Sequence, residues 1–335
     1  MNLFSVTSPF QYICALEAKA HYKTSNNILL LVEQTSELGL NQQNKLVDEK
    51  EWDYVIKIPR KDRTRNLPKA IKSIRGITSG KKIEHFFHAE YHGWRSKLLL
   101  RNLHIDKEVY FDDGTLTINE YEEEIRPKNI YRRKRIFNDL LLTLQGIKPI
   151  GELTQSKNLE LFTIFDIVQP EHPIIKNNLS ELVKRYKKPR LFSESGAAGF
   201  IGQGAVGHKN QKSELEYLSE VNAFCKIHDS VVYFPHRTES DDIRSKIECI
   251  SNLKYHKSEY PLEIEIFEKN IILSKLVGTN STVLFSAKII FPEMKVSFIQ
   301  TNVDNYSEKN KLRNNRIVTY LEKAKINKIN LDTKQ

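Results

Sequence analysis

Hydrophobic residues along the chain fall into short continuous runs that alternate with segments of helical spacing. Apolar runs bounded by polar residues, such as Asn27–Val32, are typical of strands buried on both faces of a parallel sheet. Between the runs, apolar residues recur three or four positions apart, as in Phe10–Tyr22, which predicts amphipathic helices. In the first half, the pattern predicts strands at Leu3–Val6, Asn27–Val32, Tyr54–Ile58, Lys82–Phe87, Glu108–Phe111 and Leu161–Val168. This alternation favours a doubly wound α/β domain.

A second α/β region follows a proline-containing segment, Gln169–Asn178, which is typical of a linker. Helices are predicted at Leu179–Tyr186, Ser213–His228, Asp242–Ile250 and Phe267–Ser274, and strands at Pro189–Ser193, Val231–Phe234, Leu262–Ile266, Ile289–Phe291 and Val296–Ile299. The 335 residues exceed one ordinary core, so two domains are expected. The predicted division is a first domain at 1–168, a linker and helix at 169–188, a second domain at 189–320 and a basic tail at 321–335.

Composition narrows the class of protein. A chain with 39% hydrophobic and 28% charged residues is typical of a soluble globular protein. The net charge of +10 favours an anionic partner: a nucleotide, a nucleic acid or an acidic membrane surface. Three widely spaced cysteines, Cys14, Cys225 and Cys249, match neither a metal-site pattern nor a disulfide framework. Reduced cysteines in a cytosolic protein are therefore expected.

Membrane contact, if it occurs, is expected to be peripheral. The opening MNLFSVTSPFQ has no basic region followed by a long apolar run, so no secretory signal is expected. No window reaches the ~18 apolar residues of a membrane span. The run Arg132-Arg133-Lys134-Arg135 lies in Asn119–Leu144, a segment whose end is predicted to be helical. This run is either a solvated helix face or a docking patch for lipid phosphates.

Adjacent carboxylates end one of the predicted strands. Asp112 and Asp113 directly follow Val109–Phe111, and Gly114 allows the chain to turn where a Cβ would clash. Two acids at the carboxyl edge of a sheet can hold a general base. The same three residues also match an ordinary solvated turn between two strands.

Three further segments are candidates for contact with a phosphate. The glycine-rich Gly196–Gly207 matches neither G-x-G-x-x-G nor a P-loop, and is either a surface loop or a source of backbone N–H donors. His236 and Arg237 follow a predicted strand, where an open α/β sheet binds its ligands, although a lone histidine there is also often structural. Ser281 and Thr282 form either a helix cap or a phosphate cradle.

Together these motifs resemble those of the bacterial lipooligosaccharide sialyltransferases and polysialyltransferases. Asp112-Asp113-Gly114 looks like their acidic-acidic-Gly motif, and His236 looks like the histidine of their His-Pro motif. Ser281-Thr282 looks like their Ser-Ser/Thr motif, and Glu263 falls where the family has a ribose-binding glutamate. The opening VTSPFQ, which contains Ser8 and Gln11, is also similar. Arg237 departs from the family, since it stands where the motif has proline.

The resemblance implies a GT-B fold, with two Rossmann-like doubly wound domains facing a central cleft, and an inverting transfer of sialic acid or a related nonulosonic acid from its CMP-activated donor. It implies that Asp112 is the general base, that Asp113 and Gly114 shape its turn, and that His236 stabilises or protonates the departing phosphate. Ser281 and Thr282 would bind that phosphate, and Glu263 the ribose. Pro235 and Arg237 would support the donor contacts, and Ser8, Gln11, Gly202 and Gly204 are candidate acceptor or loop contacts.

The expected partners are the CMP-sugar, a cell-surface glycan acceptor such as lipooligosaccharide or capsule, and the inner face of the cytoplasmic membrane of a bacterium. No cofactor is expected, and no metal, because no acidic pair has partner histidines. The dipeptide His172-Pro173 matches a His-Pro motif, but it lies in the predicted linker and is interpreted as a structural break in the chain. One alternative is a transferase of another nucleotide-activated sugar or polyol phosphate on the same scaffold. Another is a basic nucleic-acid-binding protein, although no helix-turn-helix, zinc-finger or RNP-type pattern is present.

Overall fold

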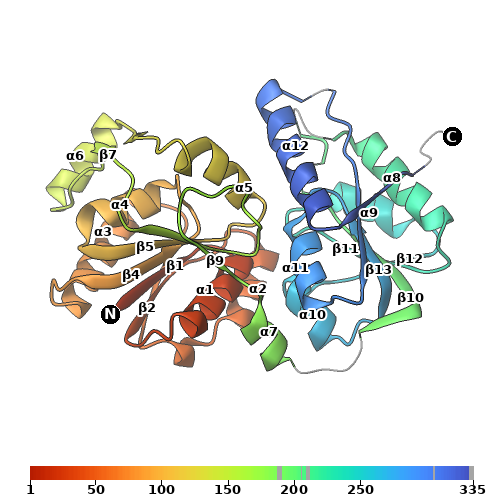
Figure 1. The fold of residues 1–335 in the computed structure, drawn as a ribbon, viewed down its shortest axis with the longest axis horizontal. Helices are drawn as coiled ribbons and strands as arrows, with labels where there is room; N and C mark the ends of the chain where they lie inside the picture. The colour runs from red at the N-terminus through yellow and green to blue at the C-terminus, as the bar shows by residue number, and fades with distance from the viewer. Residues whose placement is uncertain (187–190, 205, 209–211, 305, 332–335) are drawn as a thin grey trace. The chain divides into compact units, whose positions relative to one another are not determined.

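The computed structural model describes residues 1–186, 191–204, 206–208, 212–304 and 306–331. The chain forms two compact units, Met1–Leu182 and Val183–Gln335. Figure 1 shows that each unit is a layered α/β structure with a sheet between helices. The boundary between the units lies within the segment 169–188, in helix α7 (Ser180–Arg185).

The first unit contains a parallel sheet of seven strands in the order β3-β2-β1-β4-β5-β8-β9. The strands are β1 (Asn2–Val6), β2 (Asn27–Val32), β3 (Tyr54–Ile58), β4 (Ile83–His88), β5 (Ile105–Phe111), β8 (Leu159–Thr163) and β9 (Ile174–Lys176). The connecting helices include α1 (Pro9–His21), α2 (Glu37–Leu46), α3 (Arg63–Ile77), α4 (Trp94–Asn102) and α5 (Leu116–Glu120). The strand order reverses between β1 and β4, the place where sheets of this kind bind ligands.

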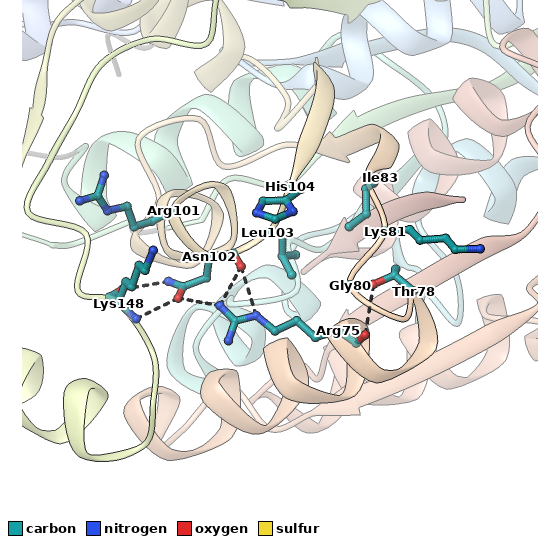
Figure 2. A pocket seen from close by; sticks show the side chains of 10 residues that line it. All are labelled: Arg75, Thr78, Gly80, Lys81, Ile83, Arg101, Asn102, Leu103, His104 and Lys148. Atoms are coloured by element: carbon teal, nitrogen blue, oxygen red, sulfur yellow. Dashed lines mark hydrogen bonds between the residues drawn. The ribbon is translucent and has the colours of Figure 1, made fainter.

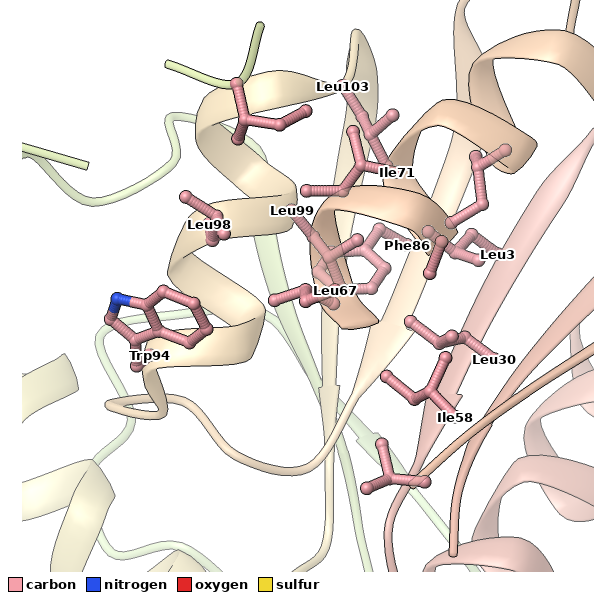
Figure 3. Packing of buried hydrophobic residues seen from close by; sticks show 14 of the residues in the cluster. Leu3, Leu30, Ile58, Leu67, Ile71, Phe86, Trp94, Leu98, Leu99 and Leu103 are labelled. Carbon is pink, nitrogen blue, oxygen red and sulfur yellow. The ribbon is translucent and has the colours of Figure 1, made fainter. Parts of the chain in front are cut away.

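Both faces of this sheet are buried, which explains the continuous apolar runs. In β2, Ile28, Leu30 and Val32 pack in one cluster with α3 and α4, whereas Leu29 and Leu31 pack in another cluster with α1. Figure 3 shows the first cluster, in which Leu67 and Ile71 of α3 and Leu98 and Leu99 of α4 meet Leu3, Leu30 and Phe86 of the strands. The predicted doubly wound arrangement is therefore confirmed.

The second unit contains a parallel sheet of six strands in the order β12-β11-β10-β13-β14-β15. Its strands are β10 (Phe192–Ile201), β11 (Val231–Phe234), β12 (Leu253–Tyr255), β13 (Leu273–Gly278), β14 (Lys295–Ile299) and β15 (Asn327–Ile329). Its helices are α8 (Glu214–Lys226), α9 (Asp241–Glu248), α10 (Leu262–Glu268), α11 (Thr282–Ile290) and α12 (Glu308–Lys323). The order reverses between β10 and β13, so this unit is also doubly wound, as predicted.

Part of the glycine-rich segment is the central strand of this sheet and not a surface loop. Residues 196–201 belong to β10, which pairs with β11 and β13. A Cβ on Gly199 would come within 2.8 Å of Leu276 Cδ1 and 3.0 Å of Leu273 Cδ1. Glycine is therefore present because neighbouring side chains fill the space beside the strand.

The predicted strand Leu262–Ile266 is wrong, because these residues form helix α10. The alternation of apolar residues with Glu263 and Glu265 has the period of a strand. Both glutamates are nevertheless buried, and both have hydrogen-bonding partners. The neighbouring predictions shift accordingly: β13 begins at Leu273, within the predicted helix Phe267–Ser274, and Ile289 and Ile290 end α11 instead of forming a strand.

The predicted linker and tail also contain sheet strands. β9 lies within 169–188 and pairs with β8, so this segment is not only a linker. β15 lies within 321–335 and pairs with β14, and Leu321 is buried at the end of α12. Residues 187–190 and 332–335, which include parts of the predicted linker, strand and tail, lie outside the described residues.

The end of the segment Asn119–Leu144 is helical, as predicted, and its charged start is irregular. A π-helical turn (Tyr121–Ile125) follows α5, and the chain then enters strand β6 (Tyr131–Arg132) before helix α6 (Ile136–Leu144). Strand β6 pairs in an antiparallel manner with β7 (Glu152–Leu153). The run Arg132–Arg135 therefore precedes a helix and does not lie on a helix face. Among the described residues, no helix combines the length and the apolar character needed to cross a membrane.

Candidate functional site

Asp112 lies at the carboxyl end of β5 and is completely buried, with no exposed surface. The Thr163 hydroxyl donates to its Oδ1 at 2.6 Å, and the Ile164 backbone N–H donates to its Oδ2 at 2.7 Å. Both donors lie at the end of the neighbouring strand β8, so the carboxyl group joins the two strand ends. Burial raises the pKa of Asp112 to about 7, while the hydrogen bonds from Thr163, Ile164 and Thr117 oppose that rise.

Asp113, the next residue, is only half-buried and has a different environment. Gln11 Nε2 donates to Asp113 Oδ1 at 2.7 Å, and the Asp113 backbone N–H donates to Thr117 Oγ1 at 3.0 Å. Gly114 has a φ of +67°, in the region that favours glycine. The segment connects β5 to α5, so its interpretation as a turn between two paired strands is wrong.

The loop after β1 holds Gln11 in place. Ser8 is the N-cap of α1, and its Oγ accepts from the Gln11 N–H at 3.3 Å. Gln11 Oε1 accepts from the Thr7 N–H at 2.7 Å, so the side-chain amide is held at both ends. The structure thus brings two predicted residues, Ser8 and Gln11, to the Asp112-Asp113 turn.

Three charged residues at the same sheet edge were not predicted from the sequence as site residues. Glu90 follows β4, and its Oε1 accepts from the Thr7 hydroxyl at 3.0 Å. Arg95 and Arg60 approach the same carboxylate at 3.5 and 3.8 Å. Within the described part of the chain, the buried Nε of Arg95 has no partner. Glu90 follows the predicted strand Lys82–Phe87, just as Asp112 follows the predicted strand Glu108–Phe111. An acidic residue after a predicted strand is the sequence signal that could have identified Glu90.

In the second unit, the loops after β10, β11 and β13 adjoin one another at the carboxyl edge of the sheet. A Cβ on Gly202 would come within 2.9 Å of the His236 backbone nitrogen, and one on Gly204 within 2.6 Å of His236 Nδ1. The Thr279 hydroxyl donates to Gln203 Oε1 at 3.2 Å, which connects the loop after β13 to the loop after β10. Gly202, Gly204 and His236, selected separately from the sequence, therefore lie together.

His236 is half-buried, and its ring orientation follows from Thr238. The Thr238 backbone N–H donates to His236 Nδ1 at 3.2 Å, and the Thr238 hydroxyl lies 2.8 Å from the same nitrogen. Because Nδ1 accepts, Nε2 carries the proton in the neutral ring. No described residue bonds to this Nε2–H. Burial, with a smaller contribution from Arg237, lowers the pKa of His236 to about 4, so the ring is neutral at physiological pH.

Three tyrosines support the His236 loop, of which Tyr217 and Tyr233 are buried and Tyr255 is half-buried. The hydroxyl of Tyr217 from α8 lies 2.7 Å from that of Tyr233 from β11, and it also accepts from the Gln203 N–H at 3.1 Å. Tyr233 and Tyr255 both donate to the Glu239 carboxylate, Tyr255 at 2.7 Å. Side chains from three elements thus fix the loop between β11 and α9.

Ser281 is the N-cap of α11, and its Oγ accepts from the Val283 N–H at 3.3 Å. Thr282 is the first residue of the helix. The helix begins at the strand-order reversal between β10 and β13, where the partial positive charge of a helix N-terminus can hold an anion. The cap is therefore present, and a cap does not conflict with a phosphate site.

Glu263 does not lie in this group of loops. It is 4% exposed on α10, and its Oε1 accepts from the Ser286 hydroxyl at 2.8 Å. Burial raises the pKa of this carboxyl. In this arrangement Glu263 joins α10 to α11 and does not present a carboxylate for a ribose. Pro235 is half-buried and Arg237 is exposed, both beside His236.

A separate cavity of about 370 Å³ lies at the opposite edge of the first sheet (Figure 2). Ile83 at the start of β4 and His104 just before β5 line it, and Arg75 donates to the Asn102 carbonyl at 2.8 Å. None of the predicted site residues lines this cavity. His172 is also apart from the site: its Nε2 bonds to Gln155 at 2.9 Å and its Nδ1 to the Tyr121 hydroxyl at 3.4 Å.

No group of three or more potential metal ligands was found among the described residues.

No protein-family model and no curated protein sequence matches the chain. Several solved structures resemble it in fold. A glycosyl transferase of family 9 from Veillonella parvula DSM 2008 shares 11% identity with a TM-score of 0.42, over 96% of both chains. E. coli heptosyltransferase WaaC, solved with ADP-2-deoxy-2-fluoro heptose, shares 11% identity with a TM-score of 0.43, over 96% of this chain and 99% of that one. S. aureus MnaA, solved with UDP, shares 9% identity with a TM-score of 0.49, over 96% and 88%. Similarity at this level concerns the fold alone.

Proposed function

We propose that this protein is an inverting glycosyltransferase that moves sialic acid, or a related nonulosonic acid, from a CMP-activated donor to a hydroxyl group of a glycan. The observation that carries the proposal is the arrangement in the second unit. His236, Gly202, Gly204 and the Ser281-Thr282 helix start belong to adjoining loops at a strand-order reversal. That arrangement suits a single phosphate, and the residues are those of the motifs that resemble sialyltransferases.

In the proposed reaction, the acceptor hydroxyl oxygen attacks the anomeric carbon as the bond from that carbon to the CMP phosphate oxygen breaks. The bonding electrons leave with CMP, and the hydroxyl proton passes to a carboxylate. His236 Nε2–H, the Ser281 and Thr282 hydroxyls and the N–H groups of α11 stabilise the charge on the departing phosphate. The nearby anion also raises the pKa of His236, which favours proton donation.

The burial of the two aspartates favours Asp113 as the proton acceptor. A general base must come within hydrogen-bonding distance of the proton it removes. Asp112 has no exposed surface, and Thr163 and Ile164 already bond to its oxygens. Asp113 is partly exposed and is oriented by Gln11. The prediction that Asp112 is the base is thus revised: Asp113 takes the proton, and Asp112 holds the turn.

The variants Asp113→Asn and Asp112→Asn separate these roles. We expect Asp113→Asn to reduce transfer about 10²–10⁴-fold without changing nucleotide affinity, the usual scale for losing acid–base assistance. Asp112→Asn should cost less activity, because an amide can keep a hydrogen bond to the strand end. Both variants are compared by the release of CMP with the acceptor present. A larger loss of activity in Asp112→Asn than in Asp113→Asn would show that Asp112 is the base.

A panel of nucleotides tests the donor class. CMP and CDP should raise the thermal unfolding temperature, since a ligand at a hundredfold excess over its Kd adds about 2.7 kcal/mol of stability. Mass spectrometry of CMP release with candidate acceptors should follow. A response to UDP or GDP alone would point to another nucleotide-activated sugar. A salt-dependent response to oligonucleotides without any nucleotide effect would point to nucleic-acid binding.

A further inference from the structure

Helix α6 presents an apolar face to solvent. Its exposed fractions are 81% for Ile136, 84% for Phe137, 58% for Leu140, 48% for Leu141 and 75% for Leu144. These positions follow the pattern i, i+1, i+4, i+5 and i+8, which at ~100° per residue forms one continuous side of a helix. Isolated exposed apolar residues need no explanation, but a contiguous patch of this kind marks an interaction surface.

The helix is nevertheless firmly attached to its unit. Leu142, on the opposite side, is fully buried in the cluster that α3 and α4 form with the sheet. Gln145 Nε2 donates to the Thr64 carbonyl of α3 at 3.1 Å. Strands β6 and β7, which pair with each other, flank the helix in the chain. In Figure 1, α6 lies at the outer margin of the first unit, near β7. The outward apolar face is therefore a feature of the folded unit.

Positive charge lies beside this face. Arg133, Lys134 and Arg135 directly precede α6, and in the described part of the chain none of them has an ion-pair partner. Arg132 does, since it pairs with Glu152 at 3.3 Å. Burial, together with Arg135 and Arg133, lowers the pKa of Arg63 at the start of α3. The guanidinium groups of Arg133 and Arg135 are thus close enough to that of Arg63 to repel it.

We propose that α6 docks this protein on an anionic lipid bilayer, with its apolar face in the acyl-chain boundary and Arg133, Lys134 and Arg135 on the lipid phosphates. An apolar helix side flanked by cations matches the two components of such a surface. This inference does not depend on the proposed transferase activity. It also goes beyond the expectation of a basic docking patch, because the insertion is assigned to the side chains of α6.

Charge complementarity favours a lipid surface over a second copy of the chain. A symmetric dimer through α6 would bring the same patch of both subunits together. Both Arg133–Arg135 clusters would then border one interface, and the partner's identical patch would bring neither cluster an excess of opposite charge. An anionic bilayer instead supplies opposite charge and an apolar interior.

Vesicle flotation tests the proposal on the whole chain. The wild type should float with vesicles of phosphatidylcholine mixed with phosphatidylglycerol, and much less with phosphatidylcholine alone. The double variant Phe137→Ser, Leu144→Ser should bind the mixed vesicles at least about tenfold more weakly, because two apolar side chains no longer leave water. The matched control is Leu215→Ser on α8, at a residue that is 83% exposed and is not part of this face.

A fluorescent probe locates the insertion. Phe137→Trp should show a blue shift and quenching by brominated lipid, whereas Leu215→Trp should show neither; wild-type protein provides the background from the buried Trp52 and Trp94. Unfolding temperatures close to that of the wild type would show that the variants fold. Equal flotation of wild type and double variant, or no quenching in the Phe137→Trp variant, would overturn the proposal. So would a dimer in light scattering that the double variant disrupts.

Discussion

At the scale of the residue, Asp112 is a carboxyl group enclosed by protein, with a pKa of about 7 instead of its ordinary 3.8. A raised pKa means that folding favours the protonated form of Asp112. The contribution of Asp112 to the free energy of unfolding is therefore full below its unfolded-state pKa and is lost as pH rises through about 7. Asp112→Asn removes this titration. Between about pH 5 and about pH 7 the wild type should lose up to about 1.4 kcal/mol per pH unit relative to the variant. Urea unfolding across this range measures the difference, and a pH-independent difference would contradict it.

His236 is expected to act on the donor through the proton on Nε2. His236→Ala should weaken CMP binding about tenfold or more, the scale of a hydrogen bond to a charged group, and should also reduce turnover. His236→Gln, whose amide nitrogen can take the place of Nε2, should restore part of the affinity. His172→Ala is the control, since His172 bonds to Gln155 and Tyr121. If His236→Ala binds CMP as the wild type does, His236 does not contact the phosphate.

At the scale of the element, the start of α11 has a structural role as a capped helix end, and we propose that it also binds the donor phosphate. Loss of an N-cap costs about 1 kcal/mol of stability, so Ser281→Ala and Ser36→Ala should destabilise the protein similarly. Ser36 caps α2 of the first unit by accepting from the Gly39 N–H at 3.2 Å. Only Ser281→Ala should also weaken CMP binding, as isothermal titration would show. Equal CMP affinity in the two variants would show that Ser281 acts only as a helix cap and does not bind the phosphate.

The contact between the loops after β10 and β11 depends on a missing side chain. In Gly204→Ala the new Cβ would meet His236 Nδ1 at 2.6 Å, so the imidazole must move. We expect the variant to fold but to bind CMP several-fold more weakly. Gly76→Ala in α3 is the control: its Cβ meets nothing within 4 Å, and the change should stabilise the helix by up to about 1 kcal/mol. Unaltered CMP binding by the Gly204→Ala variant would show that Gly204 does not contribute to the CMP site.

Elements were predictable where burial alone decides them. The strand at Val231–Phe234 was located from its apolar run, and Asn27–Val32 likewise. Leu262–Ile266 was not, because Glu263 and Glu265 read as the exposed side of a strand, whereas Ser286 and His256 bond to them inside the unit. Partners that distant in sequence leave no local signal. The same reason hid Glu90, whose neighbours Thr7 and Arg60 come from two other loops.

At the scale of the whole molecule, the candidate phosphate contacts are a histidine, hydroxyls and a helix start. If these neutralise the leaving group, transfer should proceed undiminished in EDTA, and added magnesium should change the rate by less than about twofold, because no step needs a Lewis acid. A CMP-release assay in chelator measures this directly. Loss of activity in EDTA that magnesium or manganese restores would contradict the proposed chemistry.

The general class was predictable at this scale, and the details of the site were not. Alternating strand and helix patterns indicated two doubly wound units, and both sheets have that order. Burial within a turn was not visible in the sequence: Asp112 and Asp113 are adjacent and chemically identical, yet Thr163, fifty-one positions away, encloses only the first. The net charge of +10 likewise indicated an anionic partner without showing which surface carries the charge.

The parallel pairing of the strands also determines when the site can exist during synthesis. Gly199 of β10 pairs with Leu276 of β13, and Leu3 of β1 pairs with Phe86 of β4, so each sheet closes at its centre only after a long intervening segment has been made. The loops that hold Gln203 and Thr279 cannot meet before β13 has left the ribosome. A nascent chain can therefore contain every strand of the first sheet well before these loops of the second unit can meet. A nucleotide bound as proposed would therefore stabilise the finished second unit and could not guide the early assembly of either unit.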